Sequence, residues 1–182
     1  MLEQLGFPAL ATTSAGFAWT LGRCDNRVTL EEALAHLRVV AAAVSVPVNA
    51  DFEGGFAAEP ERVARHVKLA AATGIAGLSI EDSTGDEAHP LYGFELAVER
   101  IRAARSAIDE SGIGIVLTAR SEGFLCGRPD IDETARRLTD QYGGECISLP
   151  GNLAELAGIE AVAAEIARRE DLELLEINPL AL

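Results

Sequence analysis

The sequence predicts an α/β fold, in which parallel strands are joined by crossover helices. Short apolar runs without charges alternate along the chain with longer segments whose apolar residues have helical spacing. Each apolar run is followed directly by polar residues, as is typical of strands buried on both faces of a parallel sheet. With 182 residues, of which 48% are hydrophobic and 24% charged, the chain is large enough for one packed core and does not resemble a disordered protein.

Four apolar runs predict the strands of this sheet, and two weaker runs predict strands nearer the C-terminus. The four strong runs are short and uncharged, and polar residues follow each of them. The strong candidates lie at about Ala9–Thr12, Val46–Ala50, Ile75–Ile80 and Ile113–Ala119, and the weaker ones at Cys146–Leu149 and Leu172–Ile177.

The helices between the strands have recognisable ends. Thr29 and Glu32 have the spacing of a capping box, which predicts a helix start, and the alanine-rich segment that follows runs to about Val44. Pro60 suits the first turn of the next helix, which Gly74 closes. Further helices are predicted at Phe94–Ser111, from about Asp130, and over Leu153–Arg169.

Charge and cysteine content exclude several classes of partner. The chain has 29 acidic and 15 basic residues, a formal net charge of −14, so we expect neither nucleic acid nor a membrane as a partner. Three cysteines without a CxxC pair favour reduced thiols. The uncharged stretch Leu5–Gly22 contains Pro8 and follows no basic region, which argues against a membrane span or a signal peptide. We therefore expect a cytoplasmic protein.

Ionisable residues follow three consecutive predicted strands. Asp51 and Glu53 follow the second strand, and Glu81 and Arg120 follow the third and the fourth. The carboxyl ends of parallel strands meet at one edge of the sheet, where such folds bind ligands. If the backbone stays extended through Phe52, Asp51 and Glu53 point to the same side. Oxygen ligands of this kind favour Mg²⁺ or Mn²⁺, and the planar fork of an arginine suits a substrate carboxylate.

An alternative interpretation is that these carboxylates are solvated in loops and that Arg120 forms an ordinary surface salt bridge. Spacing alone does not decide between the two interpretations. Five separate motifs bear on the choice: Gly6–Gly16, Leu21-Gly22 with Asp25, Pro47–Gly55, Ile80–Ser83 and Ala119-Arg120. In order and interval, through about Leu138, these motifs resemble the isocitrate lyase and phosphoenolpyruvate mutase superfamily.

The resemblance implies a (β/α)8 barrel, or TIM barrel, that binds Mg²⁺ and a small 2-oxo acid or its enolate. It assigns the metal site to four carboxylates, which hold the ion directly or through water. It assigns the substrate carboxylate to the N–H groups and a hydroxyl of one turn, and to a guanidinium across from that turn. By position, the metal residues are Asp51, Glu53, Glu81 and Asp25, and the substrate-binding residues are Thr13, Ser14, Ala15, Gly16 and Arg120.

The loop that follows the Glu-Asp pair departs from the family pattern. Lyases of the family carry a Lys-Cys-Gly-His stretch there and mutases a lysine-bearing version, whereas Ser83–Gly93 has neither lysine nor cysteine. This difference disfavours an isocitrate or methylisocitrate lyase of the usual kind. His89 and Tyr92 are the acid–base candidates of the segment, so His89 joins Arg120 as a predicted catalytic residue. A lone loop histidine is also explained as exposed polar surface.

The length of the chain bears on the architecture. A complete (β/α)8 barrel takes about 250 residues, more than the 182 present, so we predict an incomplete barrel whose first β/α unit and last units are missing or diverged. Residues 1–182 are expected to form a single barrel-like domain, with 1–138 family-like and 139–182 a divergent C-terminal part. Six strands leave open sheet edges, which predict a homo-oligomer.

Three functions are compatible with the sequence. The first is a Mg²⁺-dependent enzyme, of the lyase type or a related hydrolase, decarboxylase or phosphonomutase. Such an enzyme would act on a small 2-oxo or enol carboxylic acid through a metal-stabilised enolate, by C–C or C–P bond chemistry. The second is a catalytically silent homologue that binds metal and carboxylate, and the third is a truncated, non-functional fragment. We favour the enzyme, because the predicted metal carboxylates and Arg120 are all present in register.

Overall fold

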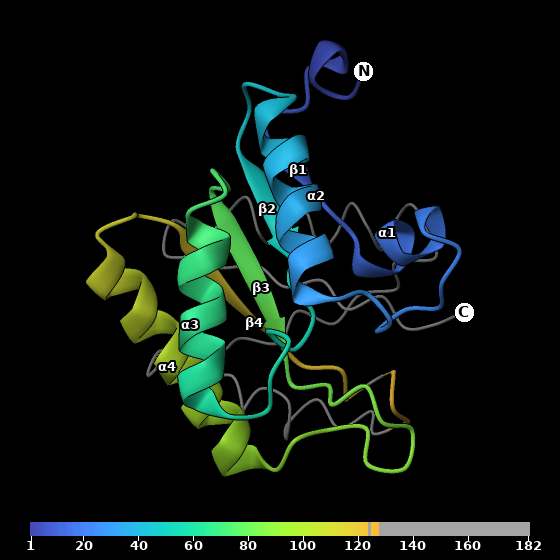
Figure 1. The fold of residues 1–182 in the computed structure, drawn as a ribbon, viewed down its shortest axis with the longest axis vertical. Helices are drawn as coiled ribbons and strands as arrows, with labels where there is room; N and C mark the ends of the chain where they lie inside the picture. The colour runs from blue at the N-terminus through green and yellow to red at the C-terminus, as the bar shows by residue number, and fades with distance from the viewer. Residues whose placement is uncertain (124, 128–182) are drawn as a thin grey trace, which may run out of the picture. The chain divides into compact units, whose positions relative to one another are not determined.

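The computed structural model describes residues 1–123 and 125–127 of the chain. They contain a four-stranded parallel sheet whose strands lie side by side in chain order (Figure 1). The strands are β1 (Leu10–Ala11), β2 (Val48–Asp51), β3 (Gly77–Glu81) and β4 (Val116–Arg120). The predicted α/β class and the first four predicted strands are therefore confirmed. The two weaker strands and the last two predicted helices lie outside the described residues.

Helices connect the strands, and the predicted start and stop signals hold for three of them. The described helices are η1 (Glu3–Leu5), α1 (Ser14–Thr20), α2 (Leu30–Ala42), α3 (Pro60–Ala71) and α4 (Phe94–Ser111). Thr29 and Glu32 exchange hydrogen bonds as a capping box before α2. Pro60 begins α3, and α4 ends at Gly112, whose φ of +67° favours glycine. None of these helices is long and apolar enough to cross a membrane.

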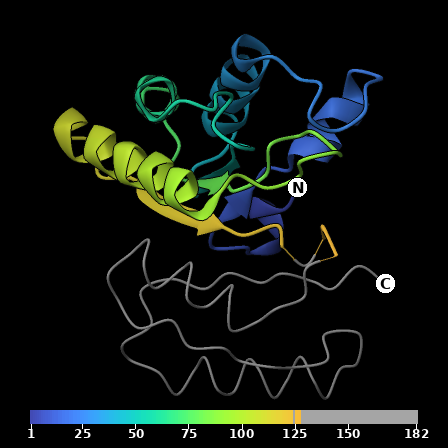
Figure 2. The same ribbon diagram turned by 90° about the horizontal axis from the view of Figure 1, so that it is seen from below.

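Helices α2, α3 and α4 lie on the same face of the sheet (Figures 1 and 2). Every second residue of β2, β3 and β4 is apolar and buried, which gives the sheet one continuous apolar face for the helices to cover. Burial of apolar surface stabilises the fold by roughly 25 cal/mol per Å². The residues of this face are Val48, Ala50, Leu78, Ile80, Leu117 and Ala119, and none is more than 6% exposed.

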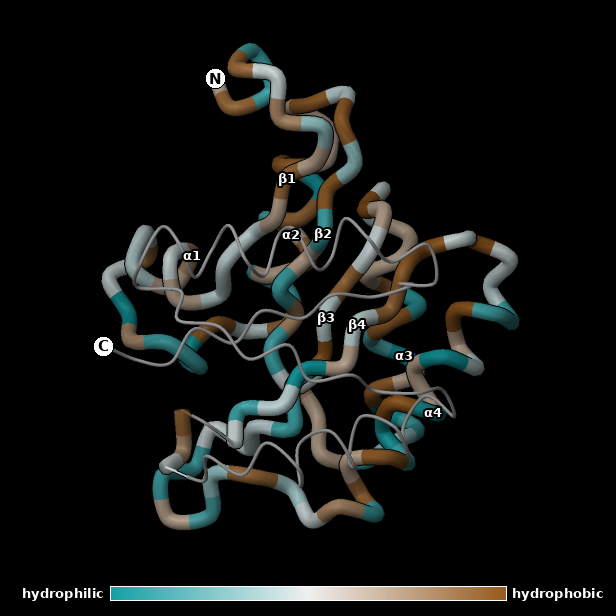
Figure 3. The backbone as a smooth tube through the Cα atoms, turned by 180° about the vertical axis from the view of Figure 1, so that it is seen from behind, coloured by the Kyte–Doolittle hydropathy of each residue, from teal (hydrophilic) through white to brown (hydrophobic). Residues whose placement is uncertain are grey.

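The opposite face of the sheet is polar near the carboxyl ends of the strands. The register pairs Asp51 with Ser79 and Ser79 with Thr118. Two residues further along β3 and β4, it pairs Glu81 with Arg120. Because side chains alternate along a strand, these residues share the face opposite helices α2, α3 and α4 (Figure 2). Figure 3, viewed from behind, shows hydrophilic residues at the ends of β3 and β4. The fold thus separates an apolar packing face from a polar face.

Candidate active site

One edge of the sheet gathers charged side chains from three neighbouring strands. Arg120, at the end of β4, has its Nη1 3.0 Å from Oε1 of Glu81, at the end of β3. The same nitrogen lies 3.8 Å from Oδ1 of Asp51, at the end of β2. The three side chains are between 9% and 30% exposed, so solvent screens these ion pairs less than pairs on an open surface. The structure therefore brings together three of the predicted site residues.

Asp51 is held in place from the side of β1. Its Oδ2 accepts hydrogen bonds from the N–H of Ser14 at 2.9 Å and from the Ser14 hydroxyl at 3.0 Å. The Asp51 N–H donates to Oγ1 of Thr12 at 3.0 Å. The other carboxylate oxygen, Oδ1, is buried and accepts no hydrogen bond from any residue in the described part of the chain. A buried oxygen of this kind is well suited to contact a cation.

The loop between β2 and α3 differs from the extended backbone that was expected. β2 ends at Asp51, and Glu53 has a φ of +48°. The Gly55 N–H donates to the Phe52 carbonyl at 2.9 Å, and the Glu81 N–H donates to the Glu53 carbonyl at 2.9 Å. The extended backbone therefore ends before Glu53, because the chain turns after Phe52, and the prediction that Asp51 and Glu53 point to the same side stays a prediction. A non-glycine residue in this left-handed region costs about 1–2 kcal/mol, and such strain is concentrated at functional sites.

Glu53 is a buried carboxyl among other carboxylates. Burial raises its pKa most, and the negative charges of Asp25 and Asp51 raise it further, to about 7. Asp25 is exposed in the loop after α1, where its Oδ1 accepts the N–H of Asn26 at 2.9 Å. The pKa of Glu53 thus depends on two other residues of the predicted site, Asp25 and Asp51, whose charges interact with its carboxyl.

The segment Thr13–Gly16, predicted to be a turn, is the start of helix α1, which sequence analysis did not predict. Oγ1 of Thr13 accepts the N–H of Gly16 at 3.5 Å, a long capping hydrogen bond. A Cβ at Gly16 would lie 2.6 Å from Cγ2 of Thr13, which explains the glycine. Ser14 directs both of its donors at Asp51 in this structure. The substrate-binding roles of Thr13, Ser14, Ala15 and Gly16 stay predictions.

The loop between β3 and α4, residues 82–93, is bonded largely to itself. Ser83 and Leu91 form an antiparallel bridge, and the Thr84 N–H donates to the Pro90 carbonyl at 2.9 Å. The His89 side chain is 85% exposed, and its Nδ1 lies 3.5 Å from Oδ2 of Asp86. This exposure is what the alternative interpretation of His89 as polar surface expects. Its catalytic role stays a prediction.

Arg100 of α4 belongs to the site, and sequence analysis missed it. Its side chain is buried, with the residue 1% exposed. Nη1 donates to the Glu81 carbonyl at 3.1 Å, and Nη2 donates to the carbonyls of Gly54 and of Ala57, the latter at 3.0 Å. The guanidinium carbon lies 4.0 Å from the centroid of the Tyr92 ring. One buried cation thus contacts the loop after β2, the end of β3 and the loop before α4.

The sequence contained a signal for Arg100. It lies three residues after Ala97 and four before Ala104, which places a charged residue on the apolar stripe of the predicted helix. A charge on a buried stripe requires hydrogen-bonding partners in the interior. The pattern therefore indicated a buried arginine, but not which groups it binds.

The described residues contain no group of three or more His, Cys, Asp or Glu side chains placed to hold a metal ion together. The four carboxylates that the resemblance assigns to the metal are thus not gathered as direct ligands in this structure. Two of them, Asp51 and Glu81, approach the same guanidinium of Arg120. The assignment of the four residues to a metal stays a prediction.

Comparison with known proteins places these features in a family. Residues 1–179 match the family model for phosphoenolpyruvate phosphomutase. The chain is 28% identical over 165 residues to 2-methylisocitrate lyase of Escherichia coli (strain K12), across 86% of this chain and 55% of that protein. The chain spans about half the length of the curated relatives it matches.

Solved structures share the fold. A protein of Burkholderia cenocepacia J2315, described as a lyase/mutase, is 37% identical with a TM-score of 0.76, over 96% of this chain and 65% of that one. Oxaloacetate acetylhydrolase, solved with its product oxalate, is 26% identical with a TM-score of 0.72, over 91% and 58%. Phosphonopyruvate hydrolase, solved with oxalate and Mg²⁺, has the same fold at 24% identity, with a TM-score of 0.73 over 90% and 58%.

The match to the family model covers nearly the whole chain and extends past Leu138, where the recognisable motifs end. The fold predicted from the resemblance, α/β and TIM-barrel-like, is confirmed by the solved structures and by the four parallel strands described above. The chain belongs to the phosphoenolpyruvate phosphomutase family, within the phosphoenolpyruvate mutase and isocitrate lyase superfamily.

Proposed function

We propose that this protein is a Mg²⁺-dependent enzyme of the lyase type that acts on a small 2-oxo or enol carboxylic acid through an enolate. The observation that carries the proposal is the approach of two carboxylates, Asp51 and Glu81 from neighbouring strands, to one cationic nitrogen of Arg120. This edge of the sheet therefore already accommodates positive charge between carboxylates. Membership in a family that includes lyases and mutases supports the proposal.

The residues present fit a hard divalent cation. Oδ1 of Asp51 is buried and accepts no hydrogen bond within the described residues, so it can bind a metal ion without losing a hydrogen bond. Burial and the charges of Asp25 and Asp51 raise the pKa of Glu53 to about 7, and added positive charge would reduce that repulsion. We therefore assign Asp51 and Glu81 to hold Mg²⁺ or Mn²⁺, directly or through water, with Glu53 and Asp25 as further acidic members.

The chemistry divides between the ion and the side chains. When bound, the ion supplies positive charge for the enolate oxygen that develops when a bond next to a ketone breaks. Ser14 keeps Asp51 oriented through two hydrogen bonds to Oδ2. Arg120 has the planar fork that binds a carboxylate through two parallel hydrogen bonds, once its ion pairs with Asp51 and Glu81 are exchanged. We assign Arg120 to the substrate carboxylate.

The relatives indicate the class of substrate. By their names, they act on 2-methylisocitrate and oxaloacetate, and the oxaloacetate acetylhydrolase structure holds oxalate. All of these are small carboxylic acids. The segment Ser83–Gly93 lacks the lysine and cysteine of the lyases, so we place hydrolysis or decarboxylation of an oxaloacetate-like acid ahead of methylisocitrate cleavage.

A catalytically silent homologue is the second candidate, and one observation favours it. The acid–base candidate His89 is exposed, and its Nδ1 lies 3.5 Å from Oδ2 of Asp86 in the same loop. A protein of this kind would bind metal and carboxylate without turnover. Measurements of binding and of turnover on the same preparation distinguish the two candidates.

The experiment is a turnover screen of small 2-oxo acids with the purified chain, in Mg²⁺ and again in EDTA. We expect Mg²⁺-dependent turnover that Asp51→Ala abolishes and that Glu87→Ala, an exposed carboxylate in residues 82–93, leaves unchanged. Metal-dependent binding without turnover would select the silent homologue. Neither binding nor turnover from a folded protein would reject both candidates.

The predicted homo-oligomer is part of this proposal. The described sheet has β1 and β4 as its two outer strands, and an open strand edge favours association. Light scattering tests it directly. A stable, well-behaved monomer would contradict self-association and leave the metal site unaffected.

A further inference from the structure

We propose that Arg100 is a positioning residue, which sets the geometry of the carboxylate site by joining the two backbone segments that carry it. The segments are the loop after β2, which contains Glu53, and the end of β3, which contains Glu81. The inference rests on the proposed function, because it concerns the same site. It adds a residue from helix α4, which contributes none of the predicted site residues.

The hydrogen bonds of Arg100 all go to main-chain carbonyls of these two segments. Nη2 donates to Gly54, the residue after Glu53, and to Ala57 in the same loop. Nη1 donates to the carbonyl of Glu81 itself at 3.1 Å. Since a guanidinium is planar and its donors have fixed directions, bonds to both segments fix their relative position.

The loop after β2 packs closely against Arg100 at Gly54. A Cβ at Gly54 would lie 2.9 Å from the carbonyl oxygen of Ser83 and 3.2 Å from Nη2 of Arg100, so only glycine fits without displacement. The Glu81 N–H donates to the Glu53 carbonyl at 2.9 Å, which adds a direct link between the same segments. The Glu53 carbonyl accepts a hydrogen bond from Glu81, and the next residue, Gly54, accepts one from Arg100. These contacts stabilise the left-handed φ of +48° at Glu53.

The charge of Arg100 is compensated by dipoles and an aromatic ring. Among the described residues, its guanidinium forms no direct salt bridge. It donates to three carbonyl oxygens, stacks on the face of Tyr92 at 4.0 Å and is attracted by the nearby charge of Asp82, while its Nε has no hydrogen-bond partner in this part of the chain. A buried cation is costly unless it is hydrogen-bonded, so the arrangement is specific to a group with several diverging donors. A lysine carries a single point charge and cannot reproduce the bonds to both segments.

The test compares Arg100→Met and Arg100→Lys with a control in the same helix, Ile108→Ala. Ile108 is 1% exposed and apolar, so its truncation destabilises the core without removing a contact to the loop. Two readouts are taken well below the unfolding temperature of each variant. The first is hydrogen exchange of the Gly55 and Glu81 amides without metal or ligand, and the second is oxalate affinity in Mg²⁺.

We expect both Arg100 variants to accelerate hydrogen exchange more at the Gly55 and Glu81 amides than at the other amides of the strands. Ile108→Ala should change the exchange rates of both groups of amides by a similar factor. We expect oxalate to bind about 10- to 100-fold more weakly to Arg100→Met, with little rescue by lysine, and within about twofold of wild type to Ile108→Ala. If Arg100→Met does not fold, Arg100→Lys supplies both readouts.

Two outcomes would overturn the proposal. Arg100 variants whose loop exchange and oxalate affinity match those of Ile108→Ala would show that the arginine only stabilises the fold. Full rescue by lysine would show that a charge, and not the fork, is needed. If wild-type protein binds no oxalate, the proposed function fails, and the exchange measurements still decide whether Arg100 positions the loop.

Discussion

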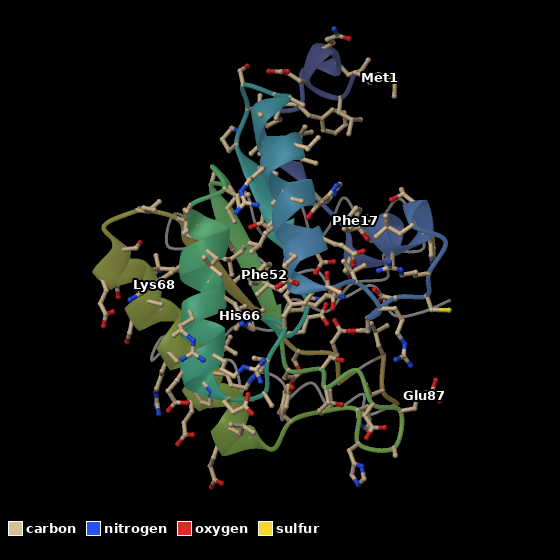
Figure 4. The ribbon with its side chains drawn as sticks, viewed as in Figure 1. Met1, Phe17, Phe52, His66, Lys68 and Glu87 are labelled. Carbon is tan, nitrogen blue, oxygen red and sulfur yellow. The ribbon has the colours of Figure 1, made fainter. Side chains whose placement is uncertain are left out.

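Two loops leave the carboxyl edge of the sheet, and the fold holds them differently. The loop after β2 has Phe52, Glu53 and Gly55 buried, and it receives hydrogen bonds from Arg100. Nδ1 of His66 on α3 also lies 2.9 Å from its Gly55 carbonyl. In the loop after β3, residues 85–89 are exposed and the loop is bonded mostly to itself, and Figure 4 shows Glu87 at the outer end of this loop.

This difference indicates that the two loops have different roles, one in ligand binding and the other in turnover. The loop after β2 and the strand ends carry the carboxylates proposed for the metal, and their geometry is set by buried contacts that exist without ligand. The loop after β3 carries His89, the predicted acid–base residue, and that side chain faces solvent. We therefore expect substitutions near β2 to affect ligand binding strongly, and substitutions in the exposed residues 85–89 to affect it little.

The largest effect is expected for Asp51→Ala and Glu81→Ala. Each substitution removes a carboxylate that approaches the Arg120 guanidinium and that we assign to the metal. Metal-dependent oxalate affinity, measured by calorimetry, should fall about 100-fold or more, equivalent to at least ~2.7 kcal/mol. Glu87→Ala in the exposed loop is the matched control and should bind normally. Wild-type affinity in both site variants would refute the metal assignment.

A smaller effect is expected for Arg120→Lys. The ammonium keeps the charge but loses the planar fork, so oxalate should bind about tenfold more weakly, or ~1.4 kcal/mol. The control is Arg105→Lys on α4, where the exposed arginine pairs with Asp109 at 2.6 Å. Equal affinity of Arg120→Lys and wild type would indicate that Arg120 serves the fold and not the ligand.

The raised pKa of Glu53 predicts a pH-dependent stability of the metal-free protein. The pKa is about 7 in the folded state against 4.5 as the ordinary value, so the folded state holds this proton more tightly. The associated stability is fully present below about pH 4.5 and is lost as the pH rises through about 7. Glu53→Gln mimics the protonated form, so it should exceed wild type by up to about 3 kcal/mol at pH 8 and nearly match it at pH 4.5.

Urea denaturation of both proteins at the two pH values measures this difference. Asp86→Asn is a suitable control, because Asp86 is an exposed acidic residue of the other loop. If Glu53→Gln has the same excess in free energy of unfolding over wild type at both pH values, the pKa of Glu53 is not raised in the folded state.

The smallest effect is expected for His89→Ala. The side chain is 85% exposed, so stability should change by less than about 0.5 kcal/mol and oxalate affinity by less than about twofold. A clear loss of turnover with unchanged binding would assign His89 to catalysis. A tenfold loss of oxalate affinity would instead show that residues 82–93 belong to the binding site, and would remove the contrast between the two loops.

The elements that sequence predicted correctly depend on local signals. The capping box of Thr29 and Glu32 and the first-turn Pro60 each act within one helical turn, so they are visible without knowledge of the fold. The site residues Asp51, Glu81 and Arg120 were found because parallel strands bring their carboxyl ends together. The distances between these side chains depend on the register of the strands, which the sequence alone does not reveal.

The features that sequence did not predict depend on contacts between distant segments. The turn at Phe52 and the left-handed Glu53 are stabilised by the Glu81 N–H, which belongs to another strand. The helix α1 is short and has one buried residue, Ala18, so it has little apolar periodicity. Arg100 finds its partners in loops far from it in the chain. No local pattern contains this information.

Calorimetric titration with oxalate tests the central claim most directly, because planar oxalate mimics an enolpyruvate chelated to a metal. The full chain is titrated in Mg²⁺ and again in EDTA, after its folding has been verified. We expect saturable binding in Mg²⁺ that EDTA abolishes. Absence of binding in both buffers, or equal binding in both, would contradict a metal-dependent carboxylate site at the strand ends.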